Sequence, residues 1–283
     1  MRKRIGSRIS NGAVYVLLLV LGVVWVLPIV YLVYTAFRVR PSTGIINQLI
    51  PDDLRLGLGN FSRLLRETDF PIWLRNTLLV SVSSCLLTTL FILMVSYALS
   101  RLRFKMRKPL MRSLLVLGMF PGFMSMIAVY FILKAMGLTN SLLALVLVYS
   151  GSAALSYYIC KGFFDTIPRA TEEAALLDGA NQLTVFWRII LPMAKPMIVY
   201  TVLTSFIAPW CDFIFVNTII GESSKYTVSL GLYKMINAER NGFNDNFTVF
   251  CAGAVVVASI IVTLFMGMQS YYVEGITAGS VKG

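Results

Sequence analysis

Long apolar runs alternate with short charged connections along the whole chain, and this alternation is the main structural signal in the sequence. A run of about 20 apolar residues crosses the hydrocarbon core of a bilayer as a helix. Six runs meet this length: 12–37, 77–100, 113–133, 139–160, 197–220 and 247–270. We therefore predict an all-α polytopic membrane protein with six transmembrane helices, in which residues 1–283 form a single domain.

The distribution of lysine and arginine among the connections predicts which side of the membrane each connection faces. With the N-terminus inside the cell, the inner connections hold 15 of these residues and the outer connections hold 10. Residues 101–112 contribute six bases without one acid, and short connections of this kind stay on the cytoplasmic side. We predict that both termini and residues 161–196 are cytoplasmic. Membrane orientation also explains the net charge of +12 better than nucleic acid as a partner does.

The N-terminal segment resembles a secretory signal peptide, because four basic residues precede an apolar run. However, residues 9–37 are uncharged throughout, which is too long for the apolar core of a signal peptide. No A-x-A-like cleavage site follows. We interpret the segment as a retained first span. In the outer connection 38–75, the segment Asn60–Leu65 is predicted to form a short surface helix.

The cytoplasmic connection 161–196 is longer than two neighbouring spans need, and its first part predicts a helix. Pro168 suits a first helical position, and two glutamates follow in the early turns, where the helix dipole favours negative charge. Gly179 is a natural C-terminal stop. The signals together predict a helix of about 11 residues, or about 16 Å.

The second part of this connection predicts an apolar stripe that packs against span ends or lies at the membrane interface. The stripe consists of Leu183, Phe186, Trp187 and Ile190. Pro192 and Pro196 are then expected to break the chain before the fifth span.

The composition of the chain argues against a catalytic site or a metal site. Histidine, the usual base near neutral pH and the commonest metal ligand, is absent. The four cysteines all lie in apolar runs without C-x-x-C spacing, so we interpret them as small core residues and expect no metal site. No G-x-x-x-x-G-K-[ST] loop is present to bind nucleotide phosphates. We predict a non-catalytic protein without a cofactor of its own.

Connection 161–196 carries a motif that resembles the permease subunits of binding-protein-dependent ABC importers. In that family, E-A-A is followed after three residues by G, and after nine more by I-x-L-P. The matching residues are Glu173, Ala174, Ala175, Gly179, Ile189, Leu191 and Pro192. Seven such matches arise by chance on the order of once in 10⁸ start positions. Residues 97–106, 134–150 and 273–283 also resemble family segments, and the last is similar to the tail of MalG-like carbohydrate permeases.

The resemblance implies an assembly in the bacterial cytoplasmic membrane. Its expected partners are a second homologous permease (MalF-like), two cytoplasmic ATPases that bind ATP and Mg²⁺, and an extracytoplasmic sugar-binding protein. It also implies that the motif forms a coupling helix that docks in a groove of the ATPase. Ala174 and Ala175 would allow the helix to approach the ATPase closely, and Gly179 would permit the sharp turn after the helix. Glu173 would form a charged contact with the ATPase, and Asp178 is a weaker candidate for such a contact. The alternative is that Glu173 is only a helix-dipole acid on a solvated surface.

Asp212 is the one charged residue within a predicted span. An intramembrane carboxylate marks either a transport pathway or a buried structural pair. Pro209 can interrupt the helix nearby, and Trp210 offers an aromatic face to a neutral sugar ring. Asp212 and Trp210 are therefore candidate pathway residues, and a hydrogen bond between spans is the alternative interpretation.

The predicted function is that of a permease subunit forming half of the pathway of an ATP-driven sugar importer. The resemblance favours an oligosaccharide such as maltodextrin, and galacto-oligosaccharides or other sugars remain alternatives. A secondary transporter driven by an ion gradient is a different class, which is expected to have several ionisable residues within its spans and repeated halves. One intramembrane carboxylate and the lack of a repeat argue against it.

Overall fold

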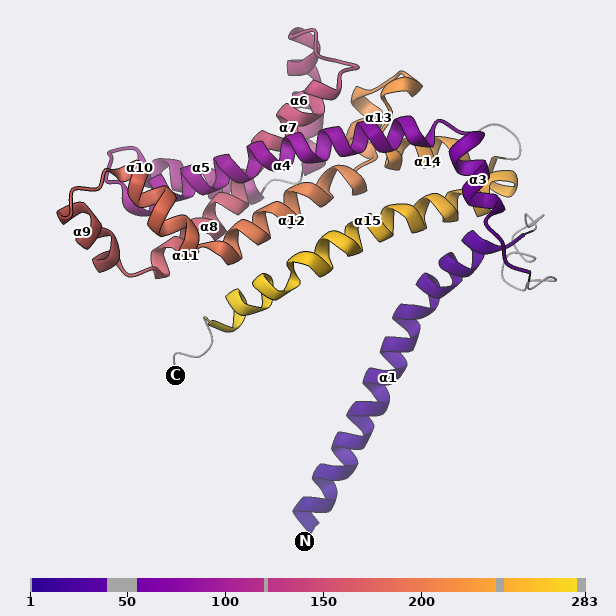
Figure 1. The fold of residues 1–283 in the computed structure, drawn as a ribbon, viewed down its shortest axis with the longest axis horizontal. Helices are drawn as coiled ribbons and strands as arrows, with labels where there is room; N and C mark the ends of the chain where they lie inside the picture. Colours follow the sequence, from indigo (N-terminus) through magenta and orange to yellow (C-terminus); the bar gives the residue numbers. More distant parts are fainter. Residues whose placement is uncertain (1, 40–54, 120–121, 238–241, 279–283) are drawn as a thin grey trace. The chain divides into compact units, whose positions relative to one another are not determined.

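The computed structural model describes residues 2–39, 55–119, 122–237 and 242–278 (Figure 1). Within these ranges the regular elements are helices, apart from one isolated bridge between Arg38 and Leu56. The chain divides into two compact units. The first comprises Met1–Thr68 with Lys234–Ala258, and the second comprises Asp69–Tyr233 with Ser259–Gly283.

The N-terminal part of the first unit contains a long apolar helix and a short helix at its end, and the unit also includes Lys234–Ala258. α1 (Arg2–Phe37) is followed by α3 (Gly59–Arg66), which confirms the short helix predicted near Asn60. The buried Asn60 side chain donates to the carbonyl oxygens of Ala36 at 3.0 Å and Arg38 at 2.8 Å. α3 is therefore fastened to the end of α1 by two buried hydrogen bonds. Residues 40–54 of the predicted outer connection lie outside the described residues.

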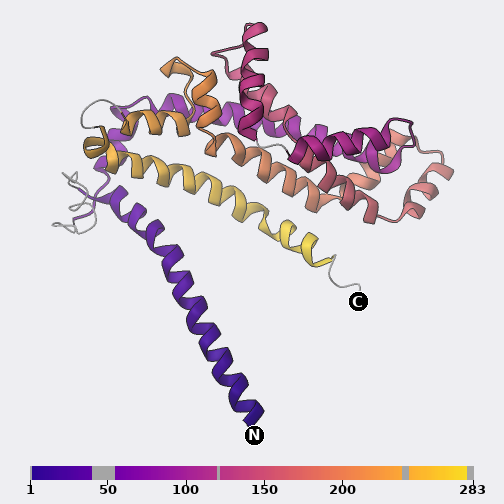
Figure 2. The same ribbon diagram turned by 180° about the vertical axis from the view of Figure 1, so that it is seen from behind.

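The second unit is a bundle arranged around α4 (Phe70–Arg101), which packs against α7 (Leu142–Gly151), α8 (Ala154–Thr166) and α12 (Lys195–Cys211). α4 and α12 lie side by side along the length of this unit (Figures 1 and 2). The helices that follow α4 are α5 (Arg107–Met119), α6 (Gly122–Ala135), α7 (Leu142–Gly151), α8 (Ala154–Thr166), α9 (Arg169–Leu177), α10 (Gln182–Val185), the π-helix η1 (Phe186–Ile190), α11 (Leu191–Met193), α12 (Lys195–Cys211), α13 (Ile214–Ile219), the 3₁₀ turn η2 (Ser223–Lys225) and α14 (Val228–Ile236). The last helix, α15 (Gly242–Ala278), contributes residues to both units. Residues 279–283 of the predicted tail lie outside the described residues.

Two apolar cores hold the second unit together, one toward each end. Figures 1 and 2 show α9 at one end of the unit and α14 at the other. The core near α9 joins α4 to α8 and η1 through Ile92, Tyr97, Phe164, Phe186 and Ile190. The core near α14 joins α4 to α7, α13 and α14 through Val80, Leu145, Val216 and Leu230.

In the described part of the chain, three stretches are long and apolar enough to cross a membrane as single helices: Val14–Phe37, Phe70–Arg101 and Asn246–Gln269. They correspond to the predicted spans 12–37, 77–100 and 247–270, although the ends of the helices and of the predicted spans differ. The other three predicted spans are each divided in the structure. The angle between α5 and α6 is 107°, and that between α7 and α8 is 42°. The fifth predicted span, 197–220, is formed by two helices: α12 ends at Cys211, and α13 begins at Ile214.

Local residues explain two of these divisions. Between α7 and α8, Gly151 is followed by Ser152 and Ala153, whose backbone angles are not helical. Gly and Ser are poor helix formers, so the helix interrupts there at little cost. Between α12 and α13, Pro209 removes a backbone donor, and the Asp212 side chain accepts a hydrogen bond from the Phe215 amide at 3.0 Å. The interruption expected from Pro209 is therefore found two residues beyond it.

Candidate functional site

The predicted helix in the connection 161–196 forms as α9, and Pro168 is its N-cap residue rather than the predicted first helical residue. Its end is a Schellman motif. The Gly179 amide donates to the Leu176 carbonyl at 3.1 Å, and the Ala180 amide donates to the Ala175 carbonyl at 3.0 Å. Gly179 has a φ of +86°, a conformation that favours glycine. The helix and its glycine stop are confirmed, although the helix is nine residues long rather than 11.

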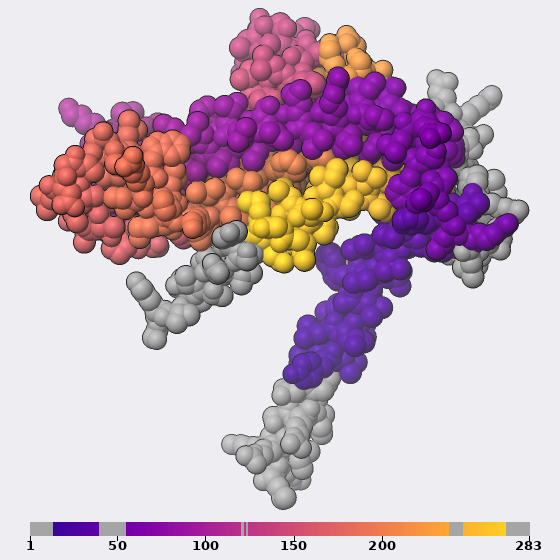
Figure 3. All heavy atoms as spheres, in the orientation of Figure 1, coloured from indigo at the N-terminus to yellow at the C-terminus, as the bar shows by residue number. Residues whose placement is uncertain are grey.

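α9 presents the motif residues unevenly to its surroundings. Glu173, Ala174, Asp178 and Gly179 are exposed, whereas Ala175 is half-buried and packs against the core near α9. Leu177 is 88% exposed. In Figure 3, α9 and the segment after it form the lobe at the left end of the molecule. The exposed side of α9 is therefore acidic at Glu173 and Asp178 and apolar at Leu177.

The two adjacent glutamates of α9 have different environments. Glu173 is exposed, but Glu172 is 7% exposed and its Oε1 lies 2.5 Å from Nε of Arg101. Burial raises the pKa of the Glu172 carboxyl above its ordinary value, and the Arg101 guanidinium offsets part of that rise. Neither Glu172 nor Arg101 was singled out in the sequence, where Arg101 is merely the first base of a basic connection.

The segment after α9 does not place its apolar residues on one common face. Phe186 and Ile190 are buried in the core near α9, as expected for a stripe that packs against span ends. Leu183 and Trp187 are 64% and 53% exposed. The π-helix η1 explains the separation, because its wider turn shifts residues from the 3.6-residue spacing on which the stripe was predicted.

The remaining motif residues lie where this segment turns into α12. Ile189 is half-buried, Leu191 is buried and Pro192 is exposed in the short helix α11. The segment 182–193 is inclined by 82° to α12, which begins at Lys195 with Pro196 in its first turn. The predicted break at the two prolines is therefore found.

Asp212 lies in the gap between α12 and α13 and connects three elements. Its Oδ2 accepts a hydrogen bond from Tyr149 Oη of α7 at 3.0 Å, and its backbone carbonyl accepts one from Ser229 Oγ of α14 at 2.9 Å. Trp210 is 4% exposed and its ring lies tilted beside that of Phe206, and its Nε1 has no hydrogen-bond partner among the described residues. The alternative interpretation of Asp212, a hydrogen bond between spans, is therefore supported by its contact with Tyr149. The interpretation of Asp212 and Trp210 as pathway residues stays a prediction.

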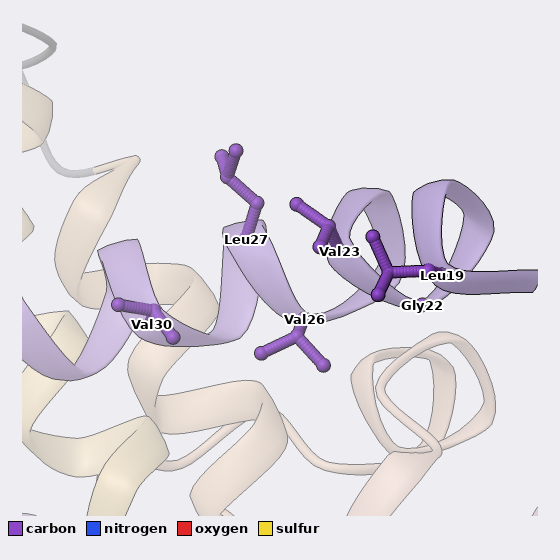
Figure 4. A pocket seen from close by; sticks show the side chains of 6 residues that line it. All are labelled: Leu19, Gly22, Val23, Val26, Leu27 and Val30. Atoms are coloured by element: carbon purple, nitrogen blue, oxygen red, sulfur yellow. The ribbon is translucent and has the colours of Figure 1, made fainter. Parts of the chain in front are cut away.

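An open groove on α1 has no polar side chain in its lining. It measures about 500 Å³ and is lined by Leu19, Gly22, Val23, Val26, Leu27 and Val30 (Figure 4). Such a surface lacks the hydrogen-bonding groups that orient a polar ligand and is typical of a helix face against lipid or another helix. Within the described ranges, no cluster of three or more His, Cys, Asp or Glu side chains is arranged to hold a metal ion.

Comparison with known proteins assigns this arrangement to a family. Residues 89–273 match the model of the family "Binding-protein-dependent transport system inner membrane component". The chain is 30% identical over 282 residues to the maltodextrin transport system permease protein MalD of Streptococcus pneumoniae, covering 99% of this chain and 98% of that protein. It is 34% identical over 212 residues to the galactooligosaccharides transport system permease protein GanQ of Bacillus subtilis, covering 75% and 74%.

A solved structure shares the fold. A chain of a bacterial ABC transporter that imports the acidic polysaccharide alginate superposes with a TM-score of 0.78 at 22% identity, covering 94% of this chain and 98% of that one. The matched family region contains α9, the residues of its motif and the Arg101–Glu172 pair. This chain therefore belongs to the family of inner membrane components of binding-protein-dependent transport systems.

Proposed function

We propose that this chain is the permease subunit of an ATP-driven importer of oligosaccharides, and that α9 docks on a cytoplasmic ATPase. The observation that carries the proposal is the surface of α9. The helix lies at one end of its unit and exposes Glu173, Ala174 and Leu177 on a short, well-terminated scaffold. A small helix with exposed apolar and acidic residues suits a groove in a partner protein.

The remaining subunits follow from the family. The chain has no nucleotide-binding loop, so two ATPase subunits would bind ATP and Mg²⁺ and supply the energy. A second, homologous permease would complete the pathway, and an external binding protein would deliver the sugar. One structural neighbour, at a TM-score of 0.63, is an alginate transporter in complex with an alginate pentasaccharide-bound periplasmic protein, which supports a partner of the last kind.

The proposed topology has six crossings, with both termini and the α9 connection in the cytoplasm of a bacterial cell. Three long helices supply three of the crossings, and the pairs α5–α6 and α7–α8 together with α12–α13 supply the other three. The basic connection 101–112 supports this orientation, because short basic connections stay inside. In this arrangement residues 1–283 act as one transmembrane domain.

The proposed substrate is a neutral oligosaccharide of the maltodextrin class. The relatives MalD of Streptococcus pneumoniae and MdxG of Bacillus subtilis, both named maltodextrin permeases, are 30% and 32% identical over at least 95% of this chain. Galacto-oligosaccharides are the second candidate because of the similarity to GanQ. Asp212 and Trp210 are proposed to border the pathway, with Asp212 also holding α12 to α7.

A reconstituted assembly tests this function. Vesicles would contain the chain with the permease, ATPases and binding protein encoded beside it, and uptake of labelled maltodextrins, galacto-oligosaccharides and alginate oligomers would be measured with and without ATP. We expect ATP-dependent uptake of maltodextrins. Uptake driven by an ion gradient without ATP would instead establish the secondary-transporter class.

In the same assay, an unchanged KM and rate in Asp212→Ala would exclude the pathway role of Asp212.

A further inference from the structure

The cytoplasmic end of α4 contacts the α9 connection before, within and after α9. Before α9, Ser100 Oγ donates to Asp165 Oδ1 at 2.6 Å, and Arg101 Nη2 donates to the Ile167 carbonyl at 2.8 Å. After α9, Tyr97 Oη donates to Gln182 Oε1 at 3.0 Å. The last turn of α4 thus binds the segments on both sides of α9.

The contact within α9 is the ion pair between Arg101 and Glu172, whose side chains are 4% and 10% exposed. Among the described residues, no other side chain of α9 makes a hydrogen bond or ion pair to α4 or α8. Removing one member of a buried pair leaves an uncompensated charge, so the pair resists separation more strongly than an exposed one. Any displacement of α9 is therefore resisted most directly at Arg101.

The two neighbouring glutamates of α9 divide into an outward and an inward group. A polar hollow of about 140 Å³ lies between α9 and the end of α4, and its lining residues include Arg101, Glu172 and Glu173. Glu173 is exposed, whereas Glu172 is buried and engaged with Arg101. A force applied by a partner at Glu173 thus acts one residue away from an electrostatic link to α4.

We propose that Arg101 is a positioning residue that transmits the movement of α9 to α4 through its buried pair with Glu172. This inference rests on the proposed function, since it presupposes an ATPase that moves α9. In this scheme Glu173 binds the ATPase, and Glu172 transmits the movement of α9 to α4. Without the Arg101–Glu172 pair, the ATPase still binds and hydrolyses ATP, but α4 no longer follows α9.

The test measures sugar transported per ATP hydrolysed in the reconstituted assembly, with ATPase co-purification as a separate readout. We expect Arg101→Gln and Glu172→Gln each to retain the ATPase but to lower the transport ratio about tenfold, within the range usual for coupling between two sites. Arg101→Lys, which keeps the charge but not the second contact to Ile167, should give an intermediate ratio. Lys225→Gln, which breaks an exposed pair with Glu222 between α13 and α14, is the matched control and should leave the ratio unchanged.

A charge exchange distinguishes transmission from a general loss of structure. The double variant Arg101→Glu with Glu172→Arg restores an attractive pair, and we expect it to recover more of the ratio than either single exchange. A wild-type ratio in Arg101→Gln and Glu172→Gln would overturn the proposal. So would loss of the bound ATPase in these variants, because Arg101 would then belong to the docking surface. If the unmodified assembly transports sugar without ATP, the proposed function fails instead.

Discussion

Glu173→Lys is expected to abolish ATP-driven uptake while leaving the amount of chain in the membrane unchanged. Glu173 is exposed on α9, so its replacement removes no buried contact within the chain. At the proposed interface, reversing the charge places like charges together, which costs several kcal/mol. A loss of about 3 kcal/mol weakens binding roughly a hundredfold, because every 1.4 kcal/mol is tenfold.

The measurement is sugar uptake by cells, together with the amount of ATPase that co-purifies with the chain. Glu222→Lys is the matched control, since it reverses an exposed acidic residue beside α13, at the end of the second unit away from α9. The control is expected to transport normally. Normal uptake and ATPase retention in Glu173→Lys would show that Glu173 is only a solvated helix-dipole acid and would remove the docking role.

Gly231→Ala is expected to cause the largest loss of stability of the substitutions considered. A Cβ at position 231 would lie 2.1 Å from Cδ2 of Trp73, well inside van der Waals contact. Trp73 is 6% exposed at the start of α4, so its ring has little room to move away. Overpacking of this kind costs about 1–3 kcal/mol, and it separates α14 from α4.

Thermal unfolding of the purified chain in detergent measures this loss, and two variants control it. Gly162→Ala adds a methyl to helix α8 at a position where no atom beyond the chain neighbours and the nearby backbone of the helix lies within 4 Å, so its melting temperature should be equal or slightly higher. Trp73→Leu combined with Gly231→Ala makes space for the methyl and should recover part of the loss. If Gly231→Ala melts at the wild-type temperature, α14 does not pack against Trp73 as described.

Local signals allowed the sequence to predict α9, because every signal lies within the helix or within two residues of its ends. Pro168 precedes the first turn, and Gly179 provides the positive φ that ends it. The partner of Glu172 was not predictable in this way. Arg101 is 71 positions away, and nothing in a basic membrane-flanking connection distinguishes the one base that is buried.

The same limit applies to the helices in the membrane. Hydropathy located all six apolar runs, but it does not report where a run bends. Pro209 announced the interruption near Asp212, whereas the bend between α7 and α8 depends on Ser152 and Ala153, which are common inside membrane helices. The Tyr149 partner of Asp212 is also a tertiary contact between residues distant in sequence.

The stripe of Leu183, Phe186, Trp187 and Ile190 shows how an assumed period misleads. With 3.6 residues per turn, all four share a face, and the prediction placed that common face against span ends or at the membrane interface. The π-helical turn from Phe186 to Ile190 widens the spacing, so only Phe186 and Ile190 reach the core near α9. A π-helical turn has no sequence signature as clear as a proline or a terminal glycine.

Cysteine cross-linking determines whether α9 contacts the ATPase in the membrane. Cys211 is the exposed native cysteine among the four and would be replaced by Ser, and Ala174→Cys would place a thiol on the exposed side of α9. Single cysteines would be introduced along the ATPase surface, and membranes would be oxidised before electrophoresis. We expect a disulfide-linked species of the chain with the ATPase for Ala174→Cys and none for Ser223→Cys. Absence of any ATPase cross-link at Ala174→Cys, or labelling of that cysteine only from outside the cell, would refute the docking of α9 on a cytoplasmic ATPase.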